Sequence, residues 1–340
     1  MKTMSELERF QVDKNRLFSA THEEILNGAT TDVYFIKTYE ILKHLGLEKT
    51  RVVAEIFSSG PGVMAGTEEC LTLLRDKPVT VEVLPEGAEF EDHEVVMRIE
   101  GPYGEFGVYE TALLGILAHS SGWAKAAREC RRAAGKVPFF CFGARHVHPA
   151  VAPVMERAAV VGGADGCSCV LAASILGKPP VGTIPHAVVL ITGDTLKVAK
   201  VYDQIMPAES KRIVLVDTFK DEAEESLRVA EALKDRLEGV RLDTPGERGG
   251  VTPALVREVR ARLDQAGFHH VGVFVSGGVT PERIPALVAA GAGAFGIGSY
   301  ISDAKPIDMT MDIKEIEGRP IAKRGRIPGR TNNPRLRRAI

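Results

Sequence analysis

Short apolar segments that alternate with amphipathic stretches, beginning at Val137, constrain this fold more than any other feature. Stretches such as DEAEESLRVAEALKDRL and TPALVREVRARLDQAG have the apolar spacing of surface helices. Continuous apolar strands that each precede such a helix are typical of a parallel sheet covered on both faces. The apolar runs are VPFFCF, GCSCVLA, VGTIPHAVVL, RIVLVD, GVRLD, HVGVFVSGG and AFGIGS. Seven runs favour a (β/α) barrel of the α/β class, irregular because no clear eighth strand is present.

The first part of the chain follows a different pattern. Alternating apolar and polar residues predict half-buried antiparallel strands at Arg51–Phe57, Val79–Leu84 and Glu94–Ile99. Tyr109–Ala134 is expected to be one long helix, and Pro306–Gly318 alternates again, as a strand that returns to the N-terminal sheet.

These patterns divide the chain into three predicted parts. Residues 1–135 are expected to form an α/β sandwich domain, and residues 136–303 the (β/α) barrel. Residues 304–340 are expected to supply the return strand and a basic tail that packs on the N-terminal domain, so that C-terminal strands complete its sheet.

Composition and charge exclude several classes of protein. The chain has 340 residues, 44% of them hydrophobic, and a net charge of −2, so neither a nucleic-acid binder nor a membrane-surface protein is expected. No apolar run is long enough for a transmembrane helix, and MKTMSELERF lacks the apolar core of a signal peptide. An odd number of cysteines in a chain of this size indicates reduced thiols and a cytoplasmic location.

Candidate functional residues lie where the predicted strands end, because a barrel carries its active site at the carboxyl ends of its strands. In chain order they are Arg145, His146 and His148, then Ser168, His186, Asp217, Arg241 and Asp243, and finally Ser276-Gly277-Gly278 and Gly296-Ile297-Gly298-Ser299.

The two late glycine-rich strand ends predict a phosphate site. Glycine has no Cβ, so backbone N–H groups can approach a phosphate closely, and late barrel loops are a frequent place for such a cradle. The phosphate-binding set is Ser276, Gly277, Gly278, Gly296, Gly298 and Ser299. The alternative is that these glycines serve only tight turns.

The other strand ends mix basic, acidic and imidazole groups. Arg145 has the planar fork that pairs with a carboxylate or phosphate, and a surface salt bridge is the alternative. Asp243 beside Arg241 fits ribose hydroxyls or a simple ion pair. A lone histidine is usually structural, but Asp217 one strand later is placed to orient His186.

No metal site is predicted from the residues alone. Cys167 and Cys169 stand two apart without a Cys-x-x-Cys or a matching histidine pair, so a structural role is the better interpretation.

Together these segments resemble the nicotinate phosphoribosyltransferase family, of the type II phosphoribosyltransferase fold, and in particular its shorter archaeal-like bacterial group. The resemblance covers nearly the whole chain. Its motifs are Thr31-Asp32-Val33-Tyr34, FGARHVHP at 142–149, GTIPHA at 182–187, VDT at 216–218, GVRLD at 239–243, SGG at 276–278, GIGS at 296–299 and KRGRIPG at 323–329. The fifth strand reads RLDTPGE rather than the family's common RLDSGD, and the cysteine cluster that ends some members is missing.

The resemblance implies the substrate contacts. Phe142 and Tyr34, the latter from a neighbouring subunit, would sandwich the pyridine ring. Arg145 and Arg241 would hold substrate near the ring and ribose, and Asp243 would bind ribose. Gly278 and Gly298 would bind the 5′-phosphate, in a homodimer or higher homo-oligomer with shared active sites.

The resemblance also implies the reaction. Nicotinate and phosphoribosyl pyrophosphate would give nicotinate mononucleotide and pyrophosphate in NAD salvage, with Mg²⁺ on the leaving group. ATP would phosphorylate His186, which Asp217 orients, and its hydrolysis would drive the transfer.

Ser168 and two alternatives bear on the substrate. The related nicotinamide-using enzymes carry an aspartate where Ser168 stands, and a serine can donate a hydrogen bond to a carboxylate, which favours the acid. One alternative is a decarboxylating quinolinate phosphoribosyltransferase, which would need an Arg-Lys pair where this chain has Arg145-His146. The other is a non-catalytic phosphate-binding barrel.

Overall fold

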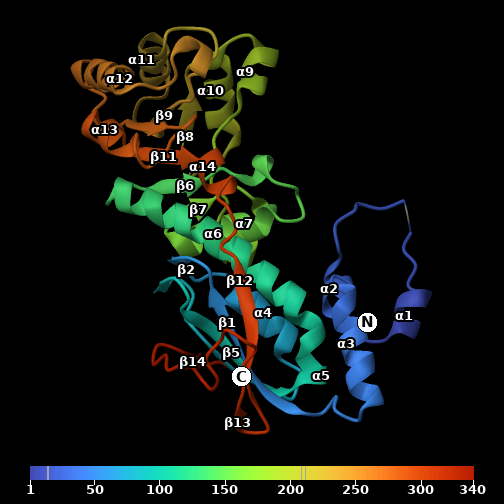
Figure 1. Cartoon of the computed structure of the whole chain (residues 1–340). Coiled ribbons are helices and arrows are strands. Elements are labelled where there is room, and N and C mark those ends of the chain that lie inside the picture. The colour runs from blue at the N-terminus through green and yellow to red at the C-terminus, as the bar shows by residue number, and fades with distance from the viewer. Residues whose placement is uncertain (14, 208, 211) are drawn as a thin grey trace. The chain divides into compact units, whose positions relative to one another are not determined.

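The chain folds into two compact units, which are described separately. The computed structural model describes residues 1–13, 15–207, 209–210 and 212–340 (Figure 1). Unit 1 comprises Met1–Lys125 and Lys305–Ile340, and unit 2 comprises Ala126–Ala304. The long helix α6, Glu110–Ala134, contributes residues to both units. The short apolar segments predicted as barrel strands lie in unit 2.

Unit 2 is built on a six-stranded parallel sheet in the order β7-β6-β11-β10-β9-β8. The strands are β6 Phe139–Cys141, β7 Gly166–Cys167, β8 Arg212–Leu215, β9 Leu237–Leu242, β10 Gly272–Val275 and β11 Ala294–Ile297. In the described part of the chain the edge strands β7 and β8 do not pair with each other, so the sheet remains an open half-barrel. The predicted α/β class and irregular barrel are confirmed in this form.

Helices follow most of these strands and cover the sheet. The helices of unit 2 beyond α6 are α7 Ala152–Gly162, α8 Val170–Ile175, α9 His186–Thr192, α10 Thr195–Ile205, α11 Glu222–Leu233, α12 Pro253–Gln265, α13 Ile284–Ala289 and α14 Ser299–Ser302. Three of these helices have side-chain N-caps. The side chains of Asp194, Asp221 and Thr252 accept hydrogen bonds from backbone N–H groups in the first turns of α10, α11 and α12. Figure 1 shows α11 and α12 beside the sheet. Three short 3₁₀ segments complete the unit: η2 Ala144–His146, η3 Lys234–Arg236 and η4 Gly246–Arg248.

The third predicted strand, VGTIPHAVVL, is wrong. Its first half is irregular and its second half is helix α9, with Pro185 as the N-cap residue. Proline lacks an N–H for a strand ladder, and the segment KPPVGTIP carries three prolines, Pro179, Pro180 and Pro185. His186 therefore opens a helix rather than closing a strand.

Unit 1 is built on a six-stranded antiparallel sheet in the order β13-β12-β1-β5-β3-β14. Its strands are β1 Arg51–Ser58, β3 Thr80–Val83, β5 Val95–Pro102, β12 Met309–Ile316, β13 Arg319–Pro320 and β14 Arg337–Arg338, beside a small pair formed by β2 Gly62–Val63 and β4 Glu89–Phe90. The three predicted N-terminal strands form, and β12 returns to pair antiparallel with β1. C-terminal strands therefore complete this sheet, as predicted.

The helices of unit 1 complete the sandwich. They are α1 Met4–Arg9, α2 His22–Leu26, α3 Val33–His44, α4 Thr67–Leu74, α5 Tyr103–Phe106, η1 Gly107–Tyr109 and the first part of α6. Fully buried Ile56, Phe90, Met97, Phe106 and Leu113 form its core. Across the described residues, no helix has both the length and the apolar character that crossing a membrane would require.

The basic tail packs on the sheet of unit 1. Arg330 pairs with Glu100 and Glu315, and Arg335 pairs with Glu94. β14 pairs with β3, and Leu336 and Ile340 lie against the apolar core. Carboxylates of the sheet therefore neutralise much of the positive charge of this segment.

Candidate active site

Arg241 organises the polar groups at the carboxyl edge of the unit 2 sheet. It lies near the end of β9 and is largely buried. Its Nε donates to Ser276 Oγ at 2.8 Å, and its Nη1 donates to Thr183 Oγ1 at 2.9 Å. Its Nη2 donates to Asp243 Oδ2 at 3.2 Å. One guanidinium thus joins three segments that are distant in sequence, and the predicted residues Arg241, Asp243 and Ser276 lie together.

A column of aromatic rings stands beside Arg241. The rings of Phe142 and Phe274 are stacked with centroids 5.9 Å apart, and those of Phe140 and Phe274 with centroids 6.0 Å apart. The Arg241 guanidinium carbon lies 5.5 Å from the Phe142 ring centroid, within range of a cation–π contact. Phe142 ends this column and is only partly buried.

Two aspartates meet next to this column. The Asp217 side chain is 1% exposed, and its Oδ2 accepts the Asp243 backbone N–H at 2.5 Å. Burial raises the pKa of Asp217 above its ordinary value, against the opposing effect of that N–H. Asp217 Oδ1 has no hydrogen-bond partner among the described residues, so it is a buried acceptor still available to a donor.

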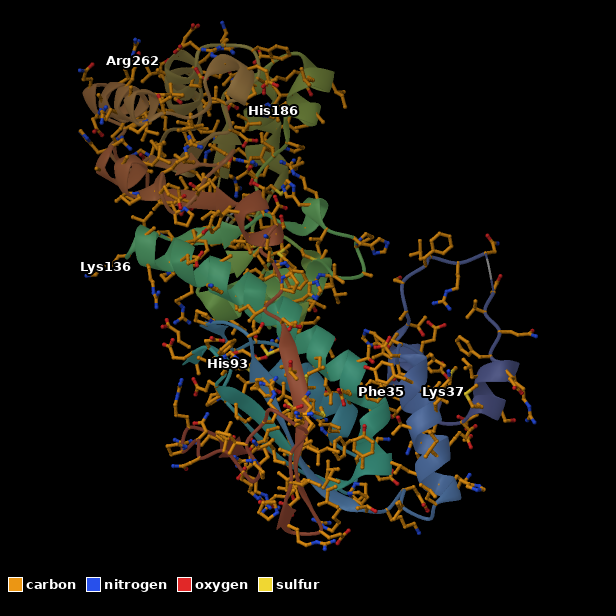
Figure 2. All side chains as sticks on the ribbon, in the orientation of Figure 1. Phe35, Lys37, His93, Lys136, His186 and Arg262 are labelled. Atoms are coloured by element: carbon orange, nitrogen blue, oxygen red, sulfur yellow. The ribbon has the colours of Figure 1, made fainter. Side chains whose placement is uncertain are left out.

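His186 faces both aspartates. Its Nδ1 lies 3.1 Å from Thr218 Oγ1, and its Nε2 lies 3.9 Å from Asp217 Oδ1 and 3.8 Å from Asp243 Oδ2. The imidazole is 37% exposed and is labelled in Figure 2. An accessible imidazole beside two carboxylates can accept a group at a ring nitrogen.

The two glycine-rich segments require glycine for different reasons. Gly277 and Gly278 have φ of +80° and +62°, a region that only glycine adopts readily. A Cβ on Gly296 would lie 2.6 Å from the Phe142 ring, and one on Gly298 would lie 2.9 Å from the Phe142 carbonyl oxygen. Tight packing on Phe142 therefore requires glycine in the second loop. Gly298 immediately precedes α14, which begins at Ser299.

Ser168 donates its hydroxyl hydrogen bond to a buried carboxylate. Its Oγ donates to Glu156 Oε1 at 2.9 Å, and Glu156 is fully buried. Glu156 also accepts the backbone N–H groups of Ala144 and Cys169. The expectation that Ser168 donates to a substrate carboxylate stays a prediction, and it requires the hydroxyl to turn from Glu156 toward the substrate.

Arg145 and Tyr34 are not among the residues that hydrogen-bond to Arg241. Arg145 belongs to η2 and is exposed at the edge of the unit 2 sheet. Tyr34 belongs to unit 1, on α3, where it is 55% exposed. The roles predicted for both in substrate binding stay predictions.

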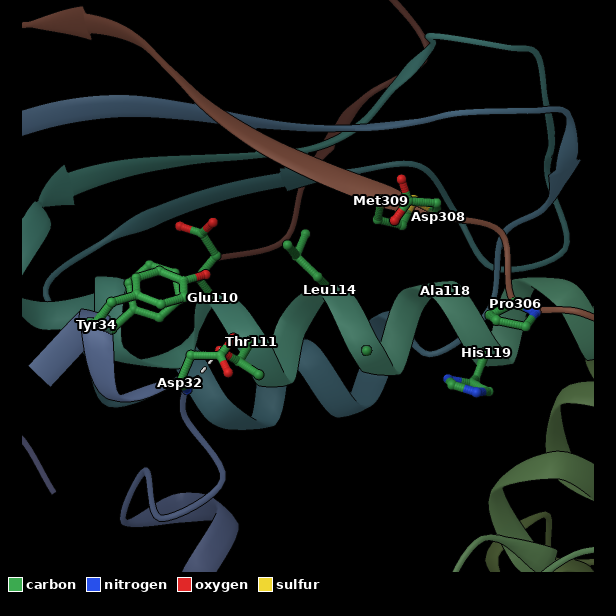
Figure 3. A pocket seen from close by; sticks show the side chains of 12 residues that line it. Asp32, Tyr34, Glu110, Thr111, Leu114, Ala118, His119, Pro306, Asp308 and Met309 are labelled. Atoms are coloured by element: carbon green, nitrogen blue, oxygen red, sulfur yellow. Dashed lines mark hydrogen bonds between the residues drawn. The ribbon is translucent and has the colours of Figure 1, made fainter. Parts of the chain in front are cut away.

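Tyr34 lines a cavity of about 360 Å³ within unit 1. Figure 3 shows its ring beside Glu110, with Leu114 and Met309 farther along the same hollow. Asp32 is held there by Thr111, whose Oγ1 lies 3.2 Å from Asp32 Oδ2. Burial raises the pKa of Glu110 to about 7.

Sequence reasoning missed several residues of the site. Thr183 and Thr218 stand inside the motifs GTIPHA and VDT, so their motifs were the available signal. Glu156 and Arg283 gave none, because a single charged residue in a helical stretch usually faces solvent. In the structure Glu156 bonds two strand-end loops, and Arg283 donates to the carbonyl oxygens of Gly278 and Val251.

An open parallel half-barrel with polar groups gathered at the carboxyl ends of its strands defines an α/β enzyme that binds its ligands at that edge. Comparison with known proteins makes this specific. The family model "Quinolinate phosphoribosyl transferase, N-terminal domain" matches residues 32–121, and "Quinolinate phosphoribosyl transferase, C-terminal domain" matches residues 123–312. The chain belongs to the quinolinate phosphoribosyl transferase family.

Individual relatives carry two kinds of name. The crystal structure of a nicotinate-nucleotide pyrophosphorylase from Pyrococcus furiosus is 45% identical, with a TM-score of 0.88 over 93% of this chain and 82% of that chain. A nicotinate phosphoribosyltransferase of Mycobacterium tuberculosis is 31% identical over 69% of this chain and 51% of its own length. One from Bacillus subtilis is 28% identical over 81% and 63%. The chain spans about half the length of the first of these two curated relatives.

Proposed function

We propose that this protein is a phosphoribosyltransferase that joins nicotinate to phosphoribosyl pyrophosphate, giving nicotinate mononucleotide and pyrophosphate. The observation that carries the proposal is the convergence of Arg241, Asp243 and Ser276 beside the Phe142–Phe274 stack. The curated relatives named nicotinate phosphoribosyltransferase support the same activity.

Each group has a role in the proposed transfer. A flat pyridine ring would lie against Phe142, close to the Arg241 guanidinium. The ring nitrogen would form a bond to ribose C1 while the bond from C1 to the pyrophosphate oxygen breaks with both electrons. Asp243 would accept the ribose hydroxyls, and the Ser276–Gly278 and Gly296–Ser299 loops would hold the 5′-phosphate. Positioning of this kind supplies much of the rate enhancement in such displacements.

The residues present fit a magnesium ion bound through the substrate. No group of three His, Cys, Asp or Glu side chains with metal-binding geometry occurs in the described ranges. Mg²⁺ usually keeps waters and needs one or two carboxylates together with substrate phosphates. Asp243 and the unpartnered oxygen of Asp217 would hold it, and the ion would neutralise the leaving pyrophosphate.

ATP coupling through His186 is the finer part of the proposal. Nε2 of the exposed imidazole would attack the γ-phosphorus, and ADP would leave with the electrons of the broken bond. The ring proton would stay on Nδ1, beside Thr218 Oγ1. Asp217 and Asp243, each within 4 Å of Nε2, would offset the positive charge that the ring gains on phosphorylation. Later hydrolysis of phospho-His186 would draw the transfer toward mononucleotide.

Decarboxylating transfer to quinolinate is the second candidate. It is favoured by the family model, which bears that name over most of the chain, and by the resemblance to the Pyrococcus furiosus structure. A dicarboxylate needs additional cations, and the exposed Arg145 would supply one. It would proceed without ATP.

One assay separates the candidates. The pure protein is incubated with phosphoribosyl pyrophosphate, Mg²⁺ and nicotinate, quinolinate or nicotinamide, each with and without ATP. We expect nicotinate mononucleotide from nicotinate, at a rate that ATP raises. Release of CO₂ from quinolinate with no use of nicotinate would replace the first candidate by the second, and no nucleotide from any base would reject both.

His186→Ala tests the phosphohistidine. We expect the variant to lose ATP stimulation and to retain slow ATP-independent transfer, because the groups that hold the two substrates are untouched. The readout is the ratio of initial rates with and without ATP. His269→Ala, at an exposed imidazole paired with Asp264, is the matched control. An unchanged ATP ratio in His186→Ala would refute the assignment.

A further inference from the structure

Arg283 donates hydrogen bonds to the loop that contains Gly277 and Gly278. It lies just before α13, and its Nη1 donates to the carbonyl oxygen of Gly278 and, at 3.4 Å, to that of Gly277. Its Nη2 donates to the Val251 carbonyl oxygen at 2.6 Å. A single guanidinium therefore fastens the loop after β10 to the loop after β9, which also carries Asp243.

These contacts decide which way the loop's donors face. In a trans peptide the C=O and the following N–H point in opposite directions, and the described chain has no cis peptide bonds. Carbonyls of Gly277 and Gly278 that turn toward Arg283 consequently turn the N–H groups of Gly278 and Val279 away from it. Neither N–H donates to any group in the described part of the chain. Two adjacent free N–H groups that share a direction form a small anion-binding concavity.

We propose that Arg283 is a positioning residue for the 5′-phosphate of phosphoribosyl pyrophosphate. It acts by orienting the backbone N–H groups of Gly278 and Val279 toward that phosphate. This inference rests on the proposed function. No carboxylate pairs with Arg283 among the described residues, so its charge also favours a nearby anion. A lysine would keep the charge but cannot donate along two directions from a rigid plane to Gly278 and Val251 at once.

Three variants separate the geometry from the charge. Arg283→Lys keeps the charge and loses the fork, and Arg283→Met loses both. Arg262→Lys, at an exposed arginine of α12 that pairs with Glu258 at 2.7 Å and is labelled in Figure 2, controls for the exchange itself. Binding of ribose 5-phosphate is measured by calorimetry, the KM values for phosphoribosyl pyrophosphate and nicotinate by initial rates, and folding by thermal unfolding.

We expect Arg283→Lys to weaken ribose 5-phosphate and to raise the KM for phosphoribosyl pyrophosphate about tenfold, the effect of losing one charge-assisted hydrogen bond. Arg283→Met should lose more, and the KM for nicotinate should stay unchanged in both. Wild-type ribose 5-phosphate binding and wild-type KM values in both variants would overturn the role of Arg283 and leave the proposed function standing. Equal losses for both substrates, or unfolding of both variants, would show a merely structural role and overturn it as well. A wild-type protein that neither turns over nor binds ribose 5-phosphate would reject the proposed function itself.

Discussion

Gly296 shows how one missing side chain shapes the site. A Cβ there would lie 2.6 Å from the Phe142 ring and 3.1 Å from the Phe274 ring. Gly296→Ala should push Phe142 out of the aromatic stack, cost about 1–3 kcal/mol of unfolding free energy, and raise the KM for nicotinate. Urea unfolding and initial rates check this. Gly293→Ala, whose Cβ would have no contact closer than 3.7 Å, is the control and should behave as wild type. Equal behaviour of the two variants would contradict the packing argument.

Glu110 makes a second residue-scale prediction, about pH. Burial raises its pKa from 4.5 to about 7, so between those values the folded protein binds more protons at this site than the unfolded chain. Its contribution to stability is complete below pH 4.5 and is lost as the pH rises through 7. Glu110→Gln should therefore match wild type below pH 4.5 and exceed it by about 3 kcal/mol at pH 8.

Urea unfolding at several pH values tests the Glu110 prediction. Glu8→Gln, at an exposed residue of α1, serves as the control and should leave the pH profile of stability unchanged. If Glu110→Gln and wild type follow parallel profiles, the buried carboxyl does not titrate in this range.

At the scale of elements, hydrophobic periodicity predicted most strands. The one wrong strand, VGTIPHAVVL, is explained by its proline content. β1, β3, β5 and β12 showed alternation, and β6 and β8–β11 showed short continuous apolar runs, since one or both faces of these strands are buried. The run VGTIPHAVVL has the same hydropathy, but Pro185 starts a helix in its middle. Apolar content alone does not distinguish a buried strand from a short helix, and the prolines were the stronger signal.

The sequence indicated some residues of the candidate site and not others. Arg241, Asp243 and Ser276 were found because strand ends converge in a parallel sheet. Glu156, which accepts the hydrogen bond of the Ser168 hydroxyl, was not found, because its partners come from two loops that only the folded chain brings together. Hydrogen-bond direction depends on such distant neighbours, which local sequence does not specify.

The C-terminal tail offers an element-scale prediction. Leu336 is partly buried against the core of unit 1, two residues from the strand pairing of Arg338 with Glu82. Leu336→Ala should lower the unfolding free energy by about 1 kcal/mol, in proportion to the apolar area exposed, without changing the KM for either substrate. Arg324→Ala, at an exposed residue of the same tail, should change neither quantity. Unaltered stability of Leu336→Ala in urea would show that the tail does not contribute to the core.

At the scale of the whole molecule, the predicted substrate residues fall in both units. Tyr34 belongs to unit 1, whereas Phe142, Arg241 and Asp243 belong to unit 2. The two family models divide the chain near the same point, with matches that end at residue 121 and begin at residue 123. Sequence reasoning placed the boundary at residue 135 because α6 continues to Ala134 without a break in its helical pattern. A helix that crosses a boundary leaves no local signal of where one unit ends.

A complementation experiment tests whether Tyr34 of one subunit serves the site of another, as the resemblance implies. Tyr34→Ala and Arg241→Ala should each be nearly inactive alone, in the homodimer that the resemblance implies. If sites are shared, a mixed dimer rebuilds one intact site, from the wild-type Tyr34 of one chain and the wild-type Arg241 of the other. Random reassortment of equal amounts makes half the dimers mixed, so about a quarter of wild-type activity should return. Each variant carried alone through the same dissociation and reassembly gives the baseline. If the two residues act within one chain, both sites of the mixed dimer stay defective and mixing restores nothing.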